Sequence, residues 1–153
     1  MALIVKKFGG SSVADAKKVM NVANLIVEDY KKGNDVIVVV SAQGDTTDDL
    51  IAKAKEINEG ASRREMDVLL SAGEQISMSL LAMALEKLGC PVISLTGWQA
   101  GMTTNSTYSN GRIKKINPDI IGIQELDYYT NRTNKTYQLE NLANMSGYEY
   151  FYY

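Results

Sequence analysis

Residues 2–13 read ALIVKKFGGSSV, and this stretch decides the fold class of the 153-residue chain. An apolar run from Ala2 to Phe8 ends at two glycines and two serines, which is typical of a strand followed by a tight turn. Glycines at this position let the backbone approach a phosphate closely, with amide N–H groups directed toward it. The stretch therefore predicts a strand and a phosphate-binding loop at Gly9 and Gly10.

The loop is preceded by a cation, because Lys7 lies just before the glycines. Its ammonium group could reach a transferring phosphoryl group, and the N-terminus of a following helix would add partial positive charge. The motif matches neither the P-loop nor the dinucleotide-binding glycine fingerprint. An ordinary strand-to-helix turn, with Ser11 or Ser12 capping the helix, therefore remains the alternative for this loop.

A helix and a second strand follow the loop. The helix is indicated by apolar residues at spacings of three and four, namely Val19, Val22, Ala23, Ile26 and Tyr30. Residues 36–40 read VIVVV, which is typical of a strand buried on both faces of a parallel sheet. Strand, helix and strand in this order predict a right-handed βαβ unit.

Residues 41–95 continue the alternation. Loop 41–47 leads into a second helix with the apolar stripe Leu50, Ile51, Ala54 and Ile57. Residues 62–88 are helical in pattern, but a central glycine costs about 1 kcal/mol, so we expect a break at Gly73 with Glu74 near the start of the second half. Residues 92–95 predict a third buried strand. The predicted fold class is α/β, a parallel sheet of at least three strands flanked by helices.

Composition narrows the function classes. A net charge of -2 without long basic blocks argues against nucleic-acid binding. No apolar run reaches the roughly 18 residues of a membrane span, and no signal peptide is evident. A single cysteine, Cys90, favours a reducing cytoplasmic location. The absence of histidine excludes Ser-His-Asp or Cys-His nucleophiles and imidazole-dependent zinc sites. Lysine, hydroxyl and carboxylate groups remain, and these suit phosphoryl transfer.

Several motifs together resemble the aspartate kinases of the amino-acid kinase family. They are KFGGSSV at residues 7–13, SAQGDTTDDL at 41–50, LLSAGEQ at 69–75, TGWQAG at 96–101 and NGRI at 110–113. Their order along roughly residues 1–115 makes the resemblance specific. Another amino-acid kinase, acting on glutamate, N-acetylglutamate or a nucleotide, is the related variant, but loop 41–50 and the Gly73-Glu74 pair favour aspartate.

The resemblance implies transfer of the ATP γ-phosphoryl to the side-chain carboxylate of L-aspartate, giving 4-phospho-aspartate for lysine, threonine and methionine biosynthesis. ATP and Mg²⁺ are the implied cofactors. Two anions must meet in this reaction, so cations and N–H donors have to neutralise the oxygens. Lys7 is the implied catalytic residue, and the implied nucleotide-binding positions are Lys7, Phe8, Gly9, Gly10 and Ser11.

Substrate binding is implied for three further residues. Ser41 and Thr47 match hydroxyl positions that would donate to the aspartate, while Glu74 matches the acidic residue that would receive its ammonium group. The alternatives are structural. Asp45, Thr46 or Thr47 could cap the second helix, and a glutamate at a helix start is a favourable dipole partner.

Two residues nearer the end of the resemblance are less specific. Arg112 matches an arginine that would serve a carboxylate or a phosphate, with a solvated surface position as the alternative. Trp98 is expected in the core rather than as a base-stacking platform.

The remaining residues, 116–153, have a different character. INPDIIGIQELD at 116–127 resembles the endonuclease/exonuclease/phosphatase family, in which the glutamate of a strand-ending Gln-Glu binds Mg²⁺; Glu125 holds that position. Arg132 and residues 138–148 also suit that family. We expect a strand at 120–123 and a helix at 138–145. That fold requires further carboxylates, an asparagine and histidines, so Glu125 is interpreted as a solvent-exposed carboxylate.

The sequence therefore predicts two parts: the N-terminal part of a kinase domain at 1–115 and a foreign C-terminal tail at 116–153, joined near 113–118. The family continues with a second nucleotide-binding portion and regulatory domains, so the kinase part reads as truncated. The alternative function is an inactive kinase remnant fused to a fragment of a Mg²⁺-dependent phosphodiesterase or phosphatase. A truncated sheet edge predicts a homo-oligomer or aggregation.

Overall fold

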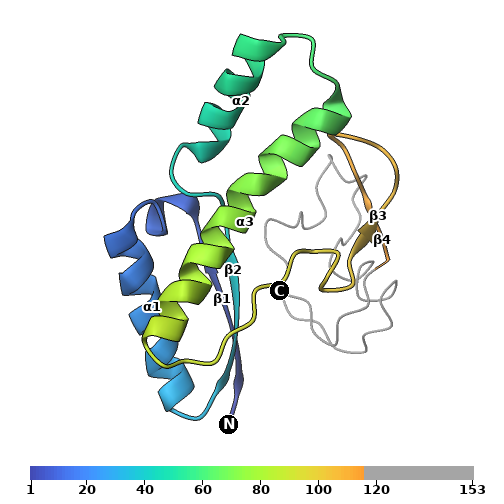
Figure 1. Ribbon diagram of the computed structural model, residues 1–153. Helices are drawn as coiled ribbons and strands as arrows, with labels where there is room; N and C mark the ends of the chain where they lie inside the picture. Colours follow the sequence, from blue (N-terminus) through green and yellow to red (C-terminus); the bar gives the residue numbers. More distant parts are fainter. Residues whose placement is uncertain (116–153) are drawn as a thin grey trace, which may run out of the picture. The chain divides into compact units, whose positions relative to one another are not determined.

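The computed structural model describes residues 1–115, and the chain forms two compact units, Met1–Ser94 and Leu95–Tyr153. The first unit is an α/β structure built from two strands, three helices and a short 3-10 turn (Figure 1). In chain order these are β1 (Leu3–Phe8), the turn Gly10–Ser12, α1 (Ala16–Lys31), β2 (Asp35–Val40), α2 (Thr46–Ile57) and α3 (Arg63–Lys87).

Strands β1 and β2 are parallel and pair in register from Leu3 opposite Asp35 to Phe8 opposite Val40. Helix α1 makes the crossover between them, so the predicted βαβ unit is confirmed. Because side chains alternate along a strand, Phe8 and Val40 share one face with Val36 and Val38, while Lys7 and Val39 lie on the other.

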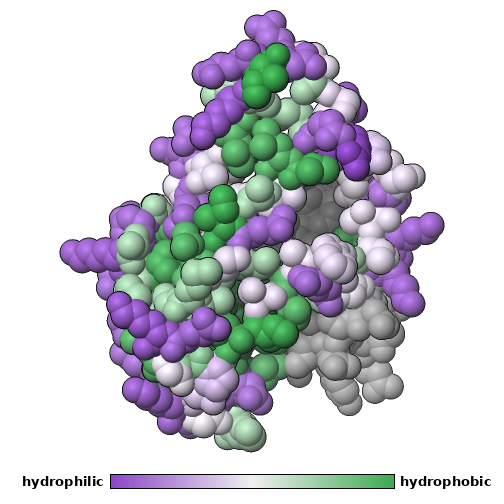
Figure 2. All heavy atoms as spheres, viewed as in Figure 1, coloured by the Kyte–Doolittle hydropathy of each residue, from purple (hydrophilic) through white to green (hydrophobic). Residues whose placement is uncertain are grey.

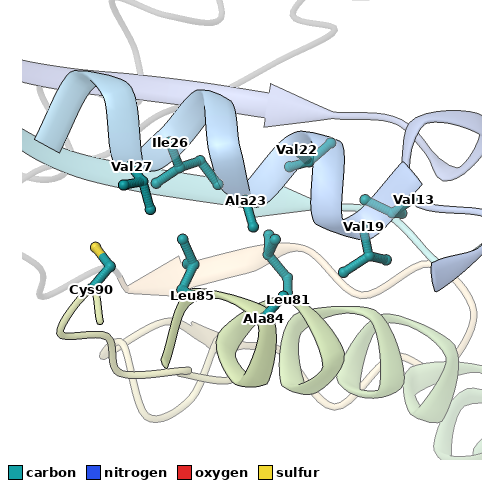
Figure 3. Packing of buried hydrophobic residues seen from close by; sticks show 10 residues of the cluster. All are labelled: Val13, Val19, Val22, Ala23, Ile26, Val27, Leu81, Ala84, Leu85 and Cys90. Atoms are coloured by element: carbon teal, nitrogen blue, oxygen red, sulfur yellow. The ribbon is translucent and has the colours of Figure 1, made fainter. Parts of the chain in front are cut away.

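Helices α1 and α3 cover the first of these faces (Figure 3). In that view, side chains of α1 point toward side chains of α3 across a narrow apolar layer. The buried cluster is Val13, Val19, Val22, Ala23, Ile26, Val27, Leu81, Ala84, Leu85 and Cys90, with Phe8, Met20, Val36, Val38, Val40 and Leu88 packed against it. Full burial of each large apolar side chain contributes about 1.5–3 kcal/mol, so this layer holds the unit together.

Local hydrogen bonds determine where helix α1 begins and ends. Its N-cap is Asp15, whose carboxylate accepts a hydrogen bond from the Lys18 N–H at 2.9 Å. Gly33 follows the helix with φ of 83°, which is typical of a glycine that ends a helix, and its N–H donates to the Tyr30 carbonyl at 2.9 Å. The predicted apolar face is buried except for Tyr30, which is exposed.

Two strand predictions are wrong. Within residues 1–94, helices cover the apolar run of β2 on one face only, because both packing helices lie on the same side; Leu3, Val5, Ile37 and Val39 are exposed on the other. Residues 92–95 form no strand, and their side chains are exposed. A short apolar run becomes a strand only where a neighbouring strand pairs with it, and within residues 1–94 the sheet contains β1 and β2 alone.

Helix α3 is continuous through Gly73, so the predicted break is wrong. The glycine is buried against the loop after β2, and this contact requires a residue without a Cβ. The helix also passes a length and hydropathy test for a membrane span, with a mean hydropathy of 1.5 over its most apolar window, contrary to the expectation from the sequence. Core helices of soluble proteins pass the same test, and one side of α3 packs on α1.

The described part of the second unit is a turn-rich segment with a small antiparallel pair, β3 (Thr103–Thr104) and β4 (Ile113–Lys115). Trp98 lies in a turn and is 74% exposed, so the prediction of a core tryptophan is wrong. The predicted strand at 120–123, the predicted helix at 138–145 and Glu125 lie outside the described residues.

Candidate functional site

The glycine loop folds into a 3-10 turn directly after β1. The Ser12 N–H donates to the Gly9 carbonyl at 2.9 Å, and the Val13 N–H donates to the Gly10 carbonyl at 3.2 Å. The N–H groups of Gly9, Gly10 and Ser11 have no hydrogen-bond acceptor within residues 1–115. The start of a helical turn leaves its first amides unpaired, so the loop offers three successive donors to a ligand.

These donors belong to the 3-10 turn and not to the first turn of α1. The helix begins at Ala16, and the Asp15 carboxylate already accepts the Lys18 N–H. The expected contribution of partial positive charge from the α1 N-terminus stays a prediction. Neither Ser11 nor Ser12 caps a helix, so the alternative of a serine-capped turn is wrong.

The glycine loop is joined to the loop after β2 by backbone contacts. The Gly44 N–H donates to the Gly10 carbonyl at 3.1 Å, and the Gln43 side-chain amide donates to the Val13 carbonyl. A Cβ added to Gly10 would lie 2.3 Å from the Ala42 carbonyl oxygen, closer than any real contact. Gly10 is therefore required by the close approach of the two loops.

Helix α3 closes the third side of this arrangement. A Cβ added to Gly73 would lie 2.9 Å from the Ala42 Cβ and 3.7 Å from the Thr46 Cγ2. Gly73 thus contacts the segment that contacts Gly10, and Glu74 is the next residue on the helix. Three segments singled out in the sequence, 9–13, 41–47 and 73–74, are brought together.

The three side chains that the resemblance implies for aspartate binding differ in their exposure to solvent. Ser41 is half-buried, whereas Thr47, in the first turn of α2, and Glu74, in the middle of α3, are exposed. Hydrogen-bond partners for these three side chains are absent from residues 1–115. Their polar groups are therefore available to a ligand. The position of Glu74 at a helix start was predicted wrongly, because α3 is unbroken.

Asp45, Thr46 and Thr47 do not cap α2 in the way that the sequence suggested. Asp45 is the N-cap but its side chain makes no cap hydrogen bond. Thr46 uses its hydroxyl to donate to the Gln43 carbonyl at 2.6 Å, which fixes the loop before the helix. Thr47 takes no part in capping, so its hydroxyl is left for the proposed substrate role.

The two consecutive lysines of β1 have different environments. Lys6 lies on the helix side, forms an ion pair with Asp29 and donates to the Leu25 carbonyl at 3.3 Å. The hydrogen bond from Lys6, with a second from Lys32, holds the pKa of Asp29 below its ordinary value. Lys7 is exposed on the opposite face and has no ion-pair partner in the described part of the chain. Of these two lysines, Lys7 is therefore the one whose ammonium group can bind an anion.

Phe8 and Arg112 behave differently from the loop residues. The Phe8 side chain packs against the core, and its carbonyl accepts the Ser41 N–H at 3.2 Å, so it positions the two loops. Arg112 belongs to the second unit, where its N–H donates to the Asn105 side chain at 3.0 Å. Its side chain is exposed.

Two positioning residues were not predicted from the sequence, Gln43 and Gly44. Gly44 has φ of 46°, a left-handed conformation that glycine adopts most easily. A glycine between polar neighbours is typical of a turn, and this was the signal for Gly44 that the sequence offered. The Gln43 contact gave no signal in the sequence. No group of three or more His, Cys, Asp or Glu residues suited to a metal ion occurs in residues 1–115.

Comparison with known proteins gives a consistent result. The Amino acid kinase family model matches residues 2–126, a range that continues past the boundary predicted at 115, and the junction with a foreign tail stays a prediction. The aspartokinase of Geobacillus stearothermophilus is 54% identical over 116 residues, and that of Mycolicibacterium smegmatis is 55% identical over 118 residues. These matches cover 76% and 77% of this chain, but the chain spans only 28% of the length of either relative.

A solved structure agrees with the sequence matches. The crystal structure of aspartate kinase from Synechocystis superposes with a TM-score of 0.63 at 47% identity, over 67% of this chain and 17% of that one. The α/β fold with a parallel strand pair and packed helices is the fold expected from the resemblance. Both the family match over most of the chain and the structural likeness lead to one conclusion: the chain belongs to the amino acid kinase family.

Proposed function

We propose that this chain carries the phosphate-binding and aspartate-binding part of an aspartate kinase, which transfers the γ-phosphoryl of ATP to the side-chain carboxylate of L-aspartate. The observation that supports this most directly is the contact of the glycine loop with residues 41–47 and, through Ala42, with Gly73. Donors for a phosphate and polar groups for an amino acid are thereby gathered at one end of β1 and β2.

In the proposed reaction, a carboxylate oxygen of aspartate attacks the γ-phosphorus while the bond from that phosphorus to the bridging oxygen of ADP breaks. The products are an acyl phosphate and ADP, and no group is oxidised or reduced. The amides of Gly9, Gly10 and Ser11 would donate to phosphate oxygens, and the Lys7 ammonium would neutralise charge on the group in flight. Their unpaired state within residues 1–115 supports this role.

Aspartate would bind between α2 and α3. The free hydroxyls of Ser41 and Thr47 can donate to a carboxylate without adding charge, and the exposed Glu74 can accept from the substrate ammonium group. Thr47 also lies in the first turn of α2, where unpaired helix amides favour an anion. Hydroxyl donors on one side of the substrate and an accepting carboxylate on the other would set its orientation.

Mg²⁺ would arrive with the nucleotide, bound to the phosphate oxygens of ATP, since Mg²⁺ usually binds through substrate phosphates with few protein ligands. Arg112 is proposed as an additional anion-binding residue. We further propose that the protein acts in the cytoplasm on these small molecules, without nucleic acid or membrane as a partner.

Calorimetric titration of this chain with ATP and Mg²⁺ tests the nucleotide part. We expect weak binding, with a Kd on the order of 1 mM, or about -4 kcal/mol, and its loss in Lys7→Ala. The matched control is Lys31→Ala, an exposed lysine at the other end of α1. Equal affinity of Lys7→Ala and the parent chain would remove Lys7 from the site, and absence of ATP binding would reject the proposal.

Aspartate specificity requires a product assay. Hydroxylamine traps acyl phosphates as hydroxamates, so aspartate-dependent hydroxamate and ADP release would demonstrate transfer by this chain. ATP binding with no product would identify the chain as the binding remnant that the sequence offers as the alternative. Product with glutamate and none with aspartate would reject the proposed acceptor.

A further inference from the structure

The loop between β3 and β4 reads NSTYSNGR at residues 105–112 and is closed at its base by its own two end residues. The Asn105 N–H donates to the Arg112 carbonyl at 2.9 Å, and the Arg112 N–H donates to the Asn105 side-chain oxygen at 3.0 Å. The same oxygen accepts the Thr107 N–H at 3.3 Å. Both ends of the loop are therefore held by hydrogen bonds.

Asn110 lies inside this loop, and no such bond holds it. It is exposed in a bend outside the regular strands, and its side-chain amide has no hydrogen-bond partner within residues 1–115. The backbone N–H of Gly111, the next residue, is also unpaired in this range. Figure 2 shows hydrophilic and intermediate residues on the visible surface where β3 and β4 lie. Water therefore has access to both groups.

The residue after Asn110 is a glycine because the loop packs closely there. A Cβ added to Gly111 would lie 3.3 Å from the Thr107 carbonyl oxygen, which is tighter than most real contacts, and 3.8 Å from the Thr104 Cβ. Without a Cβ, the backbone nitrogen of Gly111 is less shielded and its peptide bond can turn more freely. Residues 110 and 111 form the only Asn-Gly pair among the 153 residues.

We propose that Asn110 is a site of spontaneous deamidation, with the backbone nitrogen of Gly111 as the nucleophile. This nitrogen gives its proton to a base in the solvent and attacks the side-chain carbonyl carbon of Asn110. The bond from that carbon to the amide nitrogen breaks, and the amide nitrogen takes up a proton and leaves as ammonia. The product is a five-membered succinimide ring, and no group is oxidised or reduced.

Water then opens the ring at one of its two carbonyl carbons. The bond from that carbon to the Gly111 nitrogen breaks, the nitrogen regains a proton, and the carbon becomes a carboxylate. Opening at the former side-chain carbon gives aspartate. Opening at the main-chain carbon gives isoaspartate, whose backbone is longer by one carbon.

Both products place a new carboxylate two residues before Arg112, in a chain whose net charge is -2. This charge would oppose the anion-binding role proposed for Arg112. The deamidation itself depends neither on that role nor on the proposed reaction, because it requires only the loop and water.

The other asparagines within residues 1–115 are less suited to this chemistry. Asn34, Asn58 and Asn105 use their side-chain oxygens as hydrogen-bond acceptors. Asn21 and Asn24 lie in α1, where helical hydrogen bonds hold the backbone amide of the following residue. Each of these five is followed by a residue that has a side chain. The structure therefore favours reaction at Asn110.

Peptide mass spectrometry of the full chain, incubated for several days at neutral and at mildly alkaline pH, measures the conversion. Trypsin cleaves after Lys87 and Arg112, so one peptide contains both Asn105 and Asn110. Fragment masses should place the change from amide to carboxylate at Asn110, at least about tenfold faster than at Asn105. The rate should rise with pH, because the nucleophilic nitrogen must first lose its proton.

Two variants test the chemistry. Asn110→Gln has a longer side chain that would require a larger ring, so it should not convert in the same period. Gly111→Ala shields the nitrogen and should slow the conversion at Asn110 about tenfold. An isoaspartyl methyltransferase with a labelled methyl donor should label the aged parent chain above Asn110→Gln aged in parallel. Circular dichroism checks that both variants remain folded.

A synthetic peptide of residues 105–115 supplies the unfolded reference, and the folded chain should react within about tenfold of its rate. Conversion in the peptide but not in the folded chain would overturn the proposal, because the fold would then protect the amide. Equal conversion at Asn105 and Asn110 would also overturn it. A rate unchanged by pH and by Gly111→Ala would exclude the backbone nitrogen as the nucleophile.

Discussion

Gly73 of α3 lies directly against Ala42 in the loop after β2, and a Cβ added to the glycine would lie 2.9 Å from the alanine Cβ. An interior helix glycine normally lowers stability by about 1 kcal/mol relative to alanine. Here the glycine allows the helix to approach the loop that carries Ser41 and leads into the first turn of α2, where Thr47 lies. The glycine thus lowers the stability of the helix itself, but it allows the loop of the candidate site to lie against α3.

Substitution Gly73→Ala should destabilise the fold by about 1–3 kcal/mol, because overpacking outweighs the gain in helix propensity. The neighbouring Cβ belongs to Ala42 and cannot rotate away. Urea unfolding followed by circular dichroism measures the change. An increase in stability of about 1 kcal/mol, the value expected from propensity alone, would contradict the close contact.

The glycine loop offers a matched pair of variants. Gly10→Ala places a methyl group where the Ala42 carbonyl oxygen would be 2.3 Å away, and it should cost about 2–4 kcal/mol. Gly9→Ala meets nothing within 4 Å and has φ of -71°, so its stability should remain within about 0.5 kcal/mol of the parent. Thermal unfolding of the two proteins side by side measures the difference. Equal losses would show that the two loops are not held together at Gly10.

The ion pair of Asp29 with Lys6 predicts a pH dependence. The pKa of Asp29 is lowered by hydrogen bonds from Lys6 and Lys32, so the folded state binds the proton less tightly than the unfolded chain. The stabilising contribution is present above the ordinary value of 3.8 and is lost as pH falls through the lowered pKa. Asp29→Asn should therefore be less stable than the parent at neutral pH, with the difference shrinking in acid.

Urea midpoints from about pH 2 to pH 7 measure this effect. Lys6→Met removes the main partner of the same carboxylate and should show a difference of the same sign. A difference between Asp29→Asn and the parent that is constant over the whole range would show that the carboxylate charge contributes nothing.

Cys90 should react slowly with thiol reagents in the folded protein. It is only 6% exposed, and burial raises the pKa of its thiol, so little thiolate is accessible at neutral pH. We expect labelling by a disulfide reagent to be at least about tenfold slower than in denaturant. Labelling at equal rates with and without denaturant would place Cys90 outside the core.

The parts of the fold that were predicted correctly depend on short-range chemistry. The spacing of Val19, Val22, Ala23 and Ile26 is a property of one helix, and α1 buries these residues without requiring anything distant. The first strand, the glycine turn and the second strand are likewise local, and they give the parallel pair. Local patterns of this kind determine which elements form.

The wrong predictions concern contacts between distant segments. The expected break at Gly73 considered helix propensity only, whereas the deciding contact is with Ala42, 31 residues earlier in the sequence. Residues 92–95 have strand composition, but a strand also requires a partner, and the described sheet ends at β1 and β2. Both errors have the same cause, because a single-sequence pattern carries little information about neighbours.

In the candidate site, too, the local segments were predicted from the sequence and the contacts between distant residues were not. Its segments were found from the glycines, hydroxyls and Glu74, and the structure brings three of them together. The pairing of Lys6 with Asp29, which distinguishes it from Lys7, could not be found in the same way. Adjacent identical residues on a strand differ only in the face they occupy, and that depends on where the helices pack.

One face of the β1–β2 pair exposes Leu3, Val5, Ile37 and Val39 to solvent. This exposure affects how a cell would process the polypeptide. Chaperones and quality-control proteases recognise accessible aliphatic side chains on extended backbone, and this pair presents both. The lifetime of the chain would then depend on how quickly that surface is shielded after synthesis.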